Sequence, residues 1–349
     1  MQRRHDLDWV RVCAFGLLVL YHVGMYYVTW DWHVKSPAAS DALEPFMLLS
    51  SPWRLALLFL VSGAATAFLL ERQRRSAEVA RRRPGFLASR SWRLLVPLVF
   101  GMLVIVPPQS YYEVVEQLPG GYHDGYLAFY GRYLTGYDGF CDADGCLDMP
   151  TWNHLWFVAY LWVYTMVLWL LWRMAPRALI AAGRGLDKAL AGIGIVVWPT
   201  LFLGLARILL VGRFEQTHAL VDDWYNHAQY FGVFLFGFLI ARADGVWQAI
   251  ERLRWPALVA WLATQVGGWH LSWLVTGGAC VLGLWVAQRI DRAFLRLHAL
   301  RPQARLAALR GIAAHQAVDE VLDLEAPLVL LRQRDADQRA RFRAHRRFA

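Results

Sequence analysis

Long apolar stretches, separated by short charged segments, dominate the pattern of this chain. A helix needs about 20 mostly apolar residues to cross a bilayer, and stretches of roughly that length recur along the sequence. They lie at residues 9–30, 53–71, 92–110, 154–173, 190–211, 224–242, 255–270 and 271–289. The pattern predicts an all-α fold, a polytopic transmembrane helix bundle of about eight spans.

The last two stretches are short. Between Trp255 and Gln288 there is little room for two full crossings and a turn. Gly267 and Gly268 mark either a tight hairpin between two helices or a break in one tilted helix, and the sequence is compatible with both.

The composition agrees with a membrane protein. The chain is 57% hydrophobic and contains 18 Trp, whereas soluble domains are about 45–50% apolar. Its net charge is +9, and the basic residues concentrate in short segments between the apolar stretches. This distribution favours positive-inside sorting, and no nucleic-acid partner is expected. No separate apolar segment precedes the first stretch, so we expect that stretch to act as its own targeting signal.

The charges alternate along the chain in a way that predicts orientation. Residues 72–93 hold eight arginines, whereas residues 111–151 hold seven acids against Arg132 alone. Cytoplasmic segments of membrane proteins are enriched in Lys and Arg. Residues 72–93 are therefore predicted to be cytoplasmic, together with the N-terminus, and residues 111–151 to lie outside.

Two polar side chains, Arg11 and His22, lie within the first stretch. Such groups are costly inside a bilayer and usually functional. They are eleven positions apart, so at about 100° per residue the second side chain returns to within roughly 20° of the first, ~16 Å along the helix. One helix face is therefore predicted to present a cation near the cytoplasmic edge and a titratable imidazole deeper in the membrane.

Four motifs of the chain resemble those of acyltransferase family 3. They are RHDLDWVRVCAFGLLVLYHVG from Arg4, LFLVSG from Leu58, RSWRLLVPL from Arg90 and NHLWF from Asn153. Members of this family are integral membrane enzymes that move acyl groups, often acetyl or succinyl, from a cytoplasmic coenzyme A thioester to extracytoplasmic glycans and related acceptors. The resemblance covers roughly the first 240 residues and is lost after about Arg301.

The resemblance assigns the essential residues to Arg11 and His22, where the family's arginine and histidine motif falls. We expect His22 to accept a proton from the acceptor hydroxyl or to carry the acyl group briefly; the alternative is a histidine that only packs between helices. Arg11 offers fixed donors for a phosphate or for the thioester oxygen. Its alternative role is snorkelling to the membrane interface.

Two further groups of residues are candidates for substrate binding. Arg90 and Arg93 would suit the phosphates of coenzyme A, although positive-inside sorting alone also places arginine there. Asn153, His154 and Trp156 lie where the acidic outer segment enters the fourth stretch. They would form a carbohydrate platform in which His154 orients the acceptor, with interfacial anchoring as the alternative for Trp156.

The cysteines differ in their surroundings. Cys141 and Cys146 lie in the predicted outer segment, where a disulfide is expected, whereas Cys13 and Cys280 lie within apolar stretches and are expected to pack. The Asp-rich sequence near Cys141 does not match the spacing of a calcium loop, because Phe140 occupies the first ligand position. No metal site is expected.

Beyond residue 290 the chain changes character. Residues 291–349 are basic, and no uncharged run in them exceeds eight residues, which is too short for a crossing. We predict a transmembrane acyltransferase domain at residues 1–290 and a basic, non-spanning tail at residues 291–349. The tail either lies on anionic lipid or results from a truncation or a shifted reading frame.

Together these features predict an acyltransferase of a bacterial-type inner membrane. Acyl coenzyme A is the expected donor substrate, no cofactor is expected to be bound permanently, and the acceptor is a hydroxyl of an extracytoplasmic glycan or other molecule, as in O-acetylation of polysaccharides. The alternatives are an inactive family member and a transporter or flippase whose polar residues line a path. No inverted repeat or pair of broken helices is visible in the sequence, which counts against a transporter.

Overall fold

The computed structural model describes residues 5–77, 85–141 and 145–266. The chain divides into two compact units, Met1–Gln288 and Arg289–Ala349, and the described residues all belong to the first. The predicted span 271–289, the predicted tail and Cys280 lie outside the described residues.

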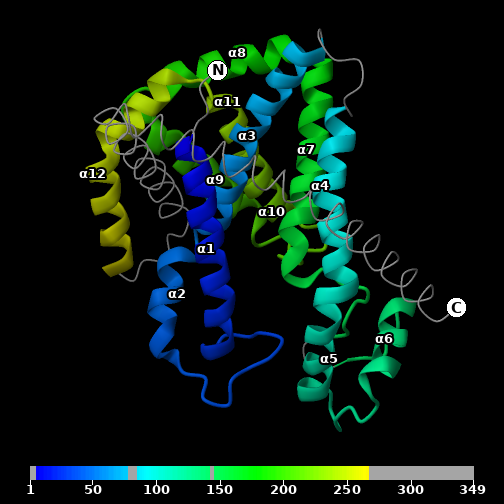
Figure 1. Cartoon of the computed structure of the whole chain (residues 1–349). Helices are drawn as coiled ribbons and strands as arrows, with labels where there is room; N and C mark the ends of the chain where they lie inside the picture. Colours follow the sequence, from blue (N-terminus) through cyan, green and yellow to red (C-terminus); the bar gives the residue numbers. More distant parts are fainter. Residues whose placement is uncertain (1–4, 78–84, 142–144, 267–349) are drawn as a thin grey trace, which may run out of the picture. The chain divides into compact units, whose positions relative to one another are not determined.

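The described part of the chain is helical, with one isolated β-bridge between Cys141 and Cys146, which confirms the predicted all-α fold (Figure 1). The helices are α1 (His5–Tyr27), η1 (Asp41–Leu43), α2 (Glu44–Ser50), α3 (Arg54–Ala77), α4 (Phe86–Phe100), η2 (Gly101–Ile105), α5 (Val106–Gln117), α6 (Tyr126–Thr135), η3 (Asn153–Leu155), α7 (Trp156–Met174), α8 (Pro176–Ala189), α9 (Gly194–Leu210), α10 (Trp224–Asn226), η4 (His227–Phe231), α11 (Gly232–Ile240) and α12 (Asp244–Val266).

Four continuous helical segments of the described part are long and apolar enough to cross a membrane. They are Leu7–Tyr27, Asp41–Glu71, Phe86–Gln117 and Asn153–Met174, and they confirm the first four predicted spans. The chain is therefore a multi-pass membrane protein.

The later spans differ from the prediction. The pair α8 and α9 is bent by 116°, and the pair formed by Trp224–Ile240 and Asp244–Val259 is bent by 111°, so the described residues hold four spans, or up to six if each bent pair is one span. The predicted span 255–270 begins inside α12, which starts at Asp244 and carries charged residues in its first half. Hydropathy alone does not reveal such bends, because it reports how apolar a segment is and not the direction of its helix axis.

Helix α1 packs against α3 on one side only. Its buried apolar residues Leu7, Val10 and Ala14 belong to the main core, which α3 also helps to form. Cys13 is exposed on α1, so it does not pack in the core as expected. Apolar side chains that the rest of the described chain leaves uncovered suit contact with lipid.

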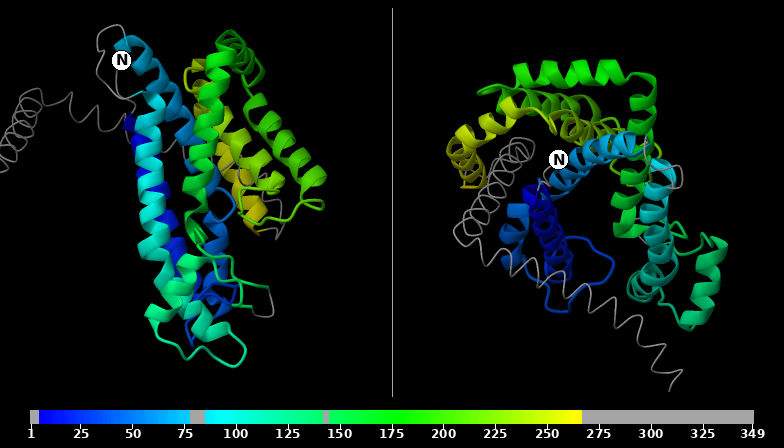
Figure 2. Two further views of the ribbon diagram at one scale, coloured as in Figure 1. Left: turned by 90° about the vertical axis from the view of Figure 1, so that its right-hand side faces the viewer. Right: turned by 45° about the horizontal axis from the view of Figure 1, so that its top comes forward.

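Helices α4 and α5 continue through η2 as one column (Figure 2). The column contains 32 residues, which is about 48 Å at 1.5 Å per residue, longer than the ~30 Å hydrocarbon core of a bilayer. The π-helical turn η2 immediately precedes Pro107 and Pro108, which cannot donate backbone hydrogen bonds. The column is therefore long enough for its last turns, which include Glu113 and Gln117, to extend beyond the hydrocarbon core.

Two glycines hold α3 against α11. A Cβ atom added at Gly63 would lie 1.9 Å from the carbonyl oxygen of Phe234, and one added at Gly237 would lie 2.0 Å from that of Leu60. The two backbones therefore touch, as small residues allow between membrane helices. Nearby, the buried ring of Phe59 contacts Phe157, Tyr164 and Tyr230 at centroid distances of 4.5, 5.5 and 4.9 Å and so joins α3, α7 and η4.

A second, smaller core lies between α5 and α6. It is formed by Val114, Phe129, Tyr133 and Phe140. Cys141 and Cys146 form a disulfide beside it, as predicted. The Tyr133 hydroxyl lies 3.0 Å from the carbonyl oxygen of Thr151, which ties this outer core to the segment that leads into η3.

We predict that Gly63→Ala destabilises the protein. The new methyl group would push α3 away from α11, and overpacking of this kind costs about 1–3 kcal/mol in the free energy of unfolding. Gly16→Ala on α1 is the control, because a Cβ atom there meets nothing within 4 Å. Thermal unfolding in detergent should give a lower Tm for Gly63→Ala only; equal Tm values for both variants would contradict the close contact.

Candidate active site

His22 lies in the last two turns of α1 with a defined protonation pattern. Its Nδ1 is 2.7 Å from the carbonyl oxygen of Leu18. A carbonyl can only accept a hydrogen bond, so Nδ1 carries the proton and Nε2 of the neutral ring carries the lone pair. The ring contacts His154 and Trp32 at centroid distances of 5.4 and 5.6 Å. His22 therefore presents a basic nitrogen among side chains from other segments.

The structure places His154 beside His22. His154 lies in η3, at the start of the fourth span, and its Nδ1 is buried with no hydrogen-bond partner in the described part of the chain. Asn153 precedes it with a left-handed φ of 38°. The Asn153 Oδ1 accepts a hydrogen bond of 2.9 Å from the Thr151 hydroxyl, while its Nδ2 is buried without a described partner. Two polar atoms at this helix start are thus buried without a hydrogen-bond partner among the described residues.

Trp156, the third predicted residue of this group, packs inside the protein. Its ring lies 4.4 Å from the ring of His218, 5.1 Å from that of Tyr160 and 5.5 Å from that of Tyr230. Through these contacts, Trp156 fills the space between α7 and the loop before α10. Anchoring at the membrane interface does not require such enclosure.

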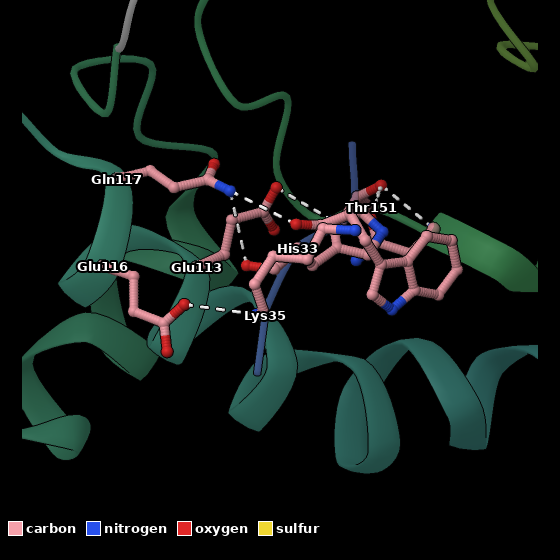
Figure 3. Close-up of polar contacts among 8 residues, drawn as sticks. His33, Lys35, Glu113, Glu116, Gln117 and Thr151 are labelled. Carbon is pink, nitrogen blue, oxygen red and sulfur yellow. Dashed lines mark hydrogen bonds and ion pairs between the residues drawn. The ribbon is translucent and has the colours of Figure 1, made fainter. Parts of the chain in front are cut away.

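The loop between α1 and η1 covers His22, which the sequence did not reveal. Trp32 contacts both His22 and His33, and the His33 Nδ1 pairs with Glu113 Oε1 of α5 at 2.9 Å (Figure 3). Gln117 Nε2 lies 3.4 Å from the carbonyl oxygen of Trp32. The projecting end of α5 therefore holds the loop in place. Because Glu113 is 80 positions from His33, no local pattern could have predicted the pair.

Arg54 is a further residue that the sequence analysis missed. It is the first residue of α3 and is only 5% exposed. Its guanidinium carbon lies 3.2 Å from the ring centroid of Tyr21, the neighbour of His22, and its charge acts on His22. Its Nε and Nη1 atoms are buried without a hydrogen-bond partner among the described residues. In the sequence, an arginine at the start of an apolar stretch looks like an interfacial anchor.

Three predicted arginines gather near the opposite end of α1. The charges of Arg11 and Arg93 both act on Arg90, so each of the two lies within electrostatic range of Arg90. Arg11 is exposed, whereas Arg90 is half-buried, with Nη2 3.4 Å from the Thr66 hydroxyl and Nε buried without a described partner. The structure thus joins the predicted donor residues into one basic cluster, separate from the histidines.

A buried polar network supports the packing around Trp156. Asp223 is fully buried, and its Oδ2 accepts hydrogen bonds from the Tyr160 hydroxyl at 2.5 Å and from Asn226 Nδ2 at 3.1 Å. His227 is bonded on both nitrogens, to the Tyr164 hydroxyl and to a backbone carbonyl. Its hydrogen-bonding capacity is filled, so this histidine is structural.

His218 connects the network to Trp156. Its backbone N–H donates to Asp223 Oδ2 at 3.2 Å. Burial lowers the pKa of His218, with Asp223 opposing the effect, which favours a neutral ring against Trp156. Across the described ranges, no group of three His, Cys, Asp or Glu side chains has the geometry to hold a metal ion.

Comparison with protein families gives one match. The model of the acyltransferase family 3 domain, described as "Acyltransferase domain", matches residues 4–308. The matched region includes every residue described above and extends past residue 290, so the domain boundary at that position stays a prediction. Comparison with curated proteins and with solved structures gives no match.

Proposed function

Because the chain belongs to acyltransferase family 3, we propose that it transfers an acetyl or succinyl group from a coenzyme A thioester to a hydroxyl of an extracytoplasmic glycan or other acceptor. The observation that carries the proposal is the separation of two groups of side chains along α1. A basic cluster lies near one end, and a histidine whose Nε2 has no hydrogen-bond partner among the described residues lies beside a second histidine near the other.

The basic cluster suits the donor. Coenzyme A carries several phosphate charges, and arginine binds phosphate oxygens with paired, charge-assisted hydrogen bonds. The Nε atom of Arg90, buried without a described partner, is available for such a bond. With the phosphates held by Arg11, Arg90 and Arg93, the long pantetheine arm would extend along α1 toward His22.

The histidine end suits the chemistry. The acceptor hydroxyl attacks the thioester carbonyl carbon while His22 Nε2 takes its proton, and the same nitrogen returns the proton to the departing thiolate. His154 and Asn153, whose polar atoms are free for a ligand, orient the acceptor. No permanently bound cofactor is needed, since coenzyme A enters and leaves as a substrate.

The charge pattern supports the orientation of the enzyme in a bacterial-type inner membrane. The arginine-rich residues 72–93 suit the cytoplasmic face, where coenzyme A is available, and the disulfide between Cys141 and Cys146 suits the oxidising outer face. The basic cluster then faces the donor. The two histidines face the acceptor.

We expect His22→Ala to abolish acyl transfer without preventing insertion, because loss of the general base costs about 10²–10⁴-fold in rate and a neutral imidazole does not drive insertion. His123→Ala is a matched control on an exposed histidine of the outer segment. Membranes supplied with labelled acyl coenzyme A measure the rate, and mass spectrometry of envelope polysaccharides identifies the product. Wild-type transfer by normally expressed His22→Ala protein would make His22 a packing residue.

Arg90→Gln should raise the KM for acyl coenzyme A while changing kcat little, because phosphate contacts bind ground state and transition state alike. An acyl-pantetheine donor without the nucleotide should react equally well with both proteins. Arg173→Gln is the control, since Arg173 lies near the aromatic ring of Trp169 at the end of α7. A KM unchanged for acyl coenzyme A would rule out a donor role for Arg90.

A further inference from the structure

Arg54 is a buried cation without a carboxylate partner in the described part of the chain. The groups that favour its charged form are the phenols of Tyr21, which also forms a side-chain hydrogen bond with it, and of Tyr230. A buried charge is costly unless it is paired and fully hydrogen-bonded. Two of its donor atoms, Nε and Nη1, have no described partner. The described residues therefore do not fully compensate the buried positive charge of Arg54.

Two other arginines of the described residues are paired with acids. Arg132 forms an ion pair of 2.8 Å with Asp124 while lying near the ring of Tyr122, and Arg242 pairs with Glu71. Arg132 thus combines a tyrosine contact with a carboxylate partner. Arg54 has only the tyrosine contact and is far more buried. The two donor atoms of Arg54 that have no described partner, Nε and Nη1, would be satisfied by an anionic or strongly polarised oxygen of a ligand.

The position of Arg54 indicates which oxygen of the substrate would accept its hydrogen bonds. The guanidinium lies against Tyr21, next to His22, at the start of α3. The phosphates of the donor belong three helical turns away, at the basic cluster that includes Arg11. What must come to His22 in the proposed reaction is the carbonyl group of the thioester, whose oxygen gains negative charge when the acceptor attacks.

We propose that Arg54 is a catalytic residue that donates hydrogen bonds from Nε and Nη1 to the acyl carbonyl oxygen of the substrate. The assignment rests on the proposed acyl transfer. A guanidinium stays protonated at all relevant pH values and has donors only, so it can stabilise an oxyanion but cannot act as the base. Preorganised donors aimed at a developing oxyanion are among the largest contributions to acyl-transfer catalysis.

In the proposed acyl transfer, His22 handles the proton and Arg54 binds the carbonyl oxygen. The acceptor oxygen forms a bond to the carbonyl carbon and gives its proton to His22 Nε2, while the carbonyl electron pair moves to the oxygen that Arg54 binds. When the C=O bond re-forms, the C–S bond breaks. The proton on His22 then passes to the coenzyme A thiolate, so the products are the ester and coenzyme A.

Kinetics of Arg54→Gln provide the first test. We expect kcat to fall about 10²–10³-fold with the KM for acyl coenzyme A nearly unchanged. Arg54→Lys keeps the charge but loses the planar, forked arrangement of donors. Its kcat should lie between those of Arg54→Gln and the wild type. Arg132→Gln, which removes an arginine that also contacts a tyrosine, should retain wild-type kcat. The loss should be equal for acetyl and succinyl donors; a loss confined to succinyl would mean that Arg54 binds the distal carboxylate and would overturn the assignment.

The infrared carbonyl band of bound acyl coenzyme A, labelled with ¹³C and measured without acceptor, tests the contact itself. Polarisation by Arg54 should lower its frequency in wild type and in His22→Ala, and the shift should vanish in Arg54→Gln. An identical band in wild type and Arg54→Gln, or an unchanged kcat, would overturn the role of Arg54 while leaving the acyl transferase function standing. A wild-type protein that transfers no acyl group would overturn the proposed function itself.

Discussion

The rigidity of one helix fixes the distance on which this protein depends. Between Arg11 and His22, α1 runs without interruption, so the cation and the imidazole are held about 16 Å apart along its axis. Neither residue can approach the other without breaking backbone hydrogen bonds that a bilayer offers no water to replace. A substrate that engages both must be long, with its charged part at one end and its reactive group at the other. An acyl thioester of coenzyme A has that form.

Buried polar groups in this protein fall into two sets. In the network of Asp223, Tyr160 and His227, the Asp223 Oδ2 atom and both ring nitrogens of His227 have hydrogen-bond partners, although Asp223 Oδ1 has none among the described residues. Near His22, by contrast, polar atoms of Arg54 and His154 are buried without described partners. Unsatisfied buried groups are costly, and the proposed substrate would supply acceptors or donors for those that lie near His22.

The sequence predicted the features that depend on local spacing or composition. The shared helix of Arg11 and His22, the first four spans and the disulfide of Cys141 with Cys146 are of this kind. It missed features that depend on tertiary contacts. His33 and Glu113 are 80 positions apart, and Tyr160 and Asp223 are 63 apart. The sequence also did not predict the bends beside α9 and α11, because hydropathy measures how apolar a segment is and not the direction of its helix axis.

The central claim is that acyl groups enter the site from one face of the membrane and leave on the other. Inverted and right-side-out vesicles from the same cells, each with a glycan acceptor trapped inside and labelled acyl coenzyme A added outside, test it directly. Only the inverted vesicles, whose cytoplasmic face is outward, should acylate the trapped glycan, and His22→Ala should remove that signal. Acylation of the trapped glycan in right-side-out vesicles, or none in inverted ones, would contradict the account.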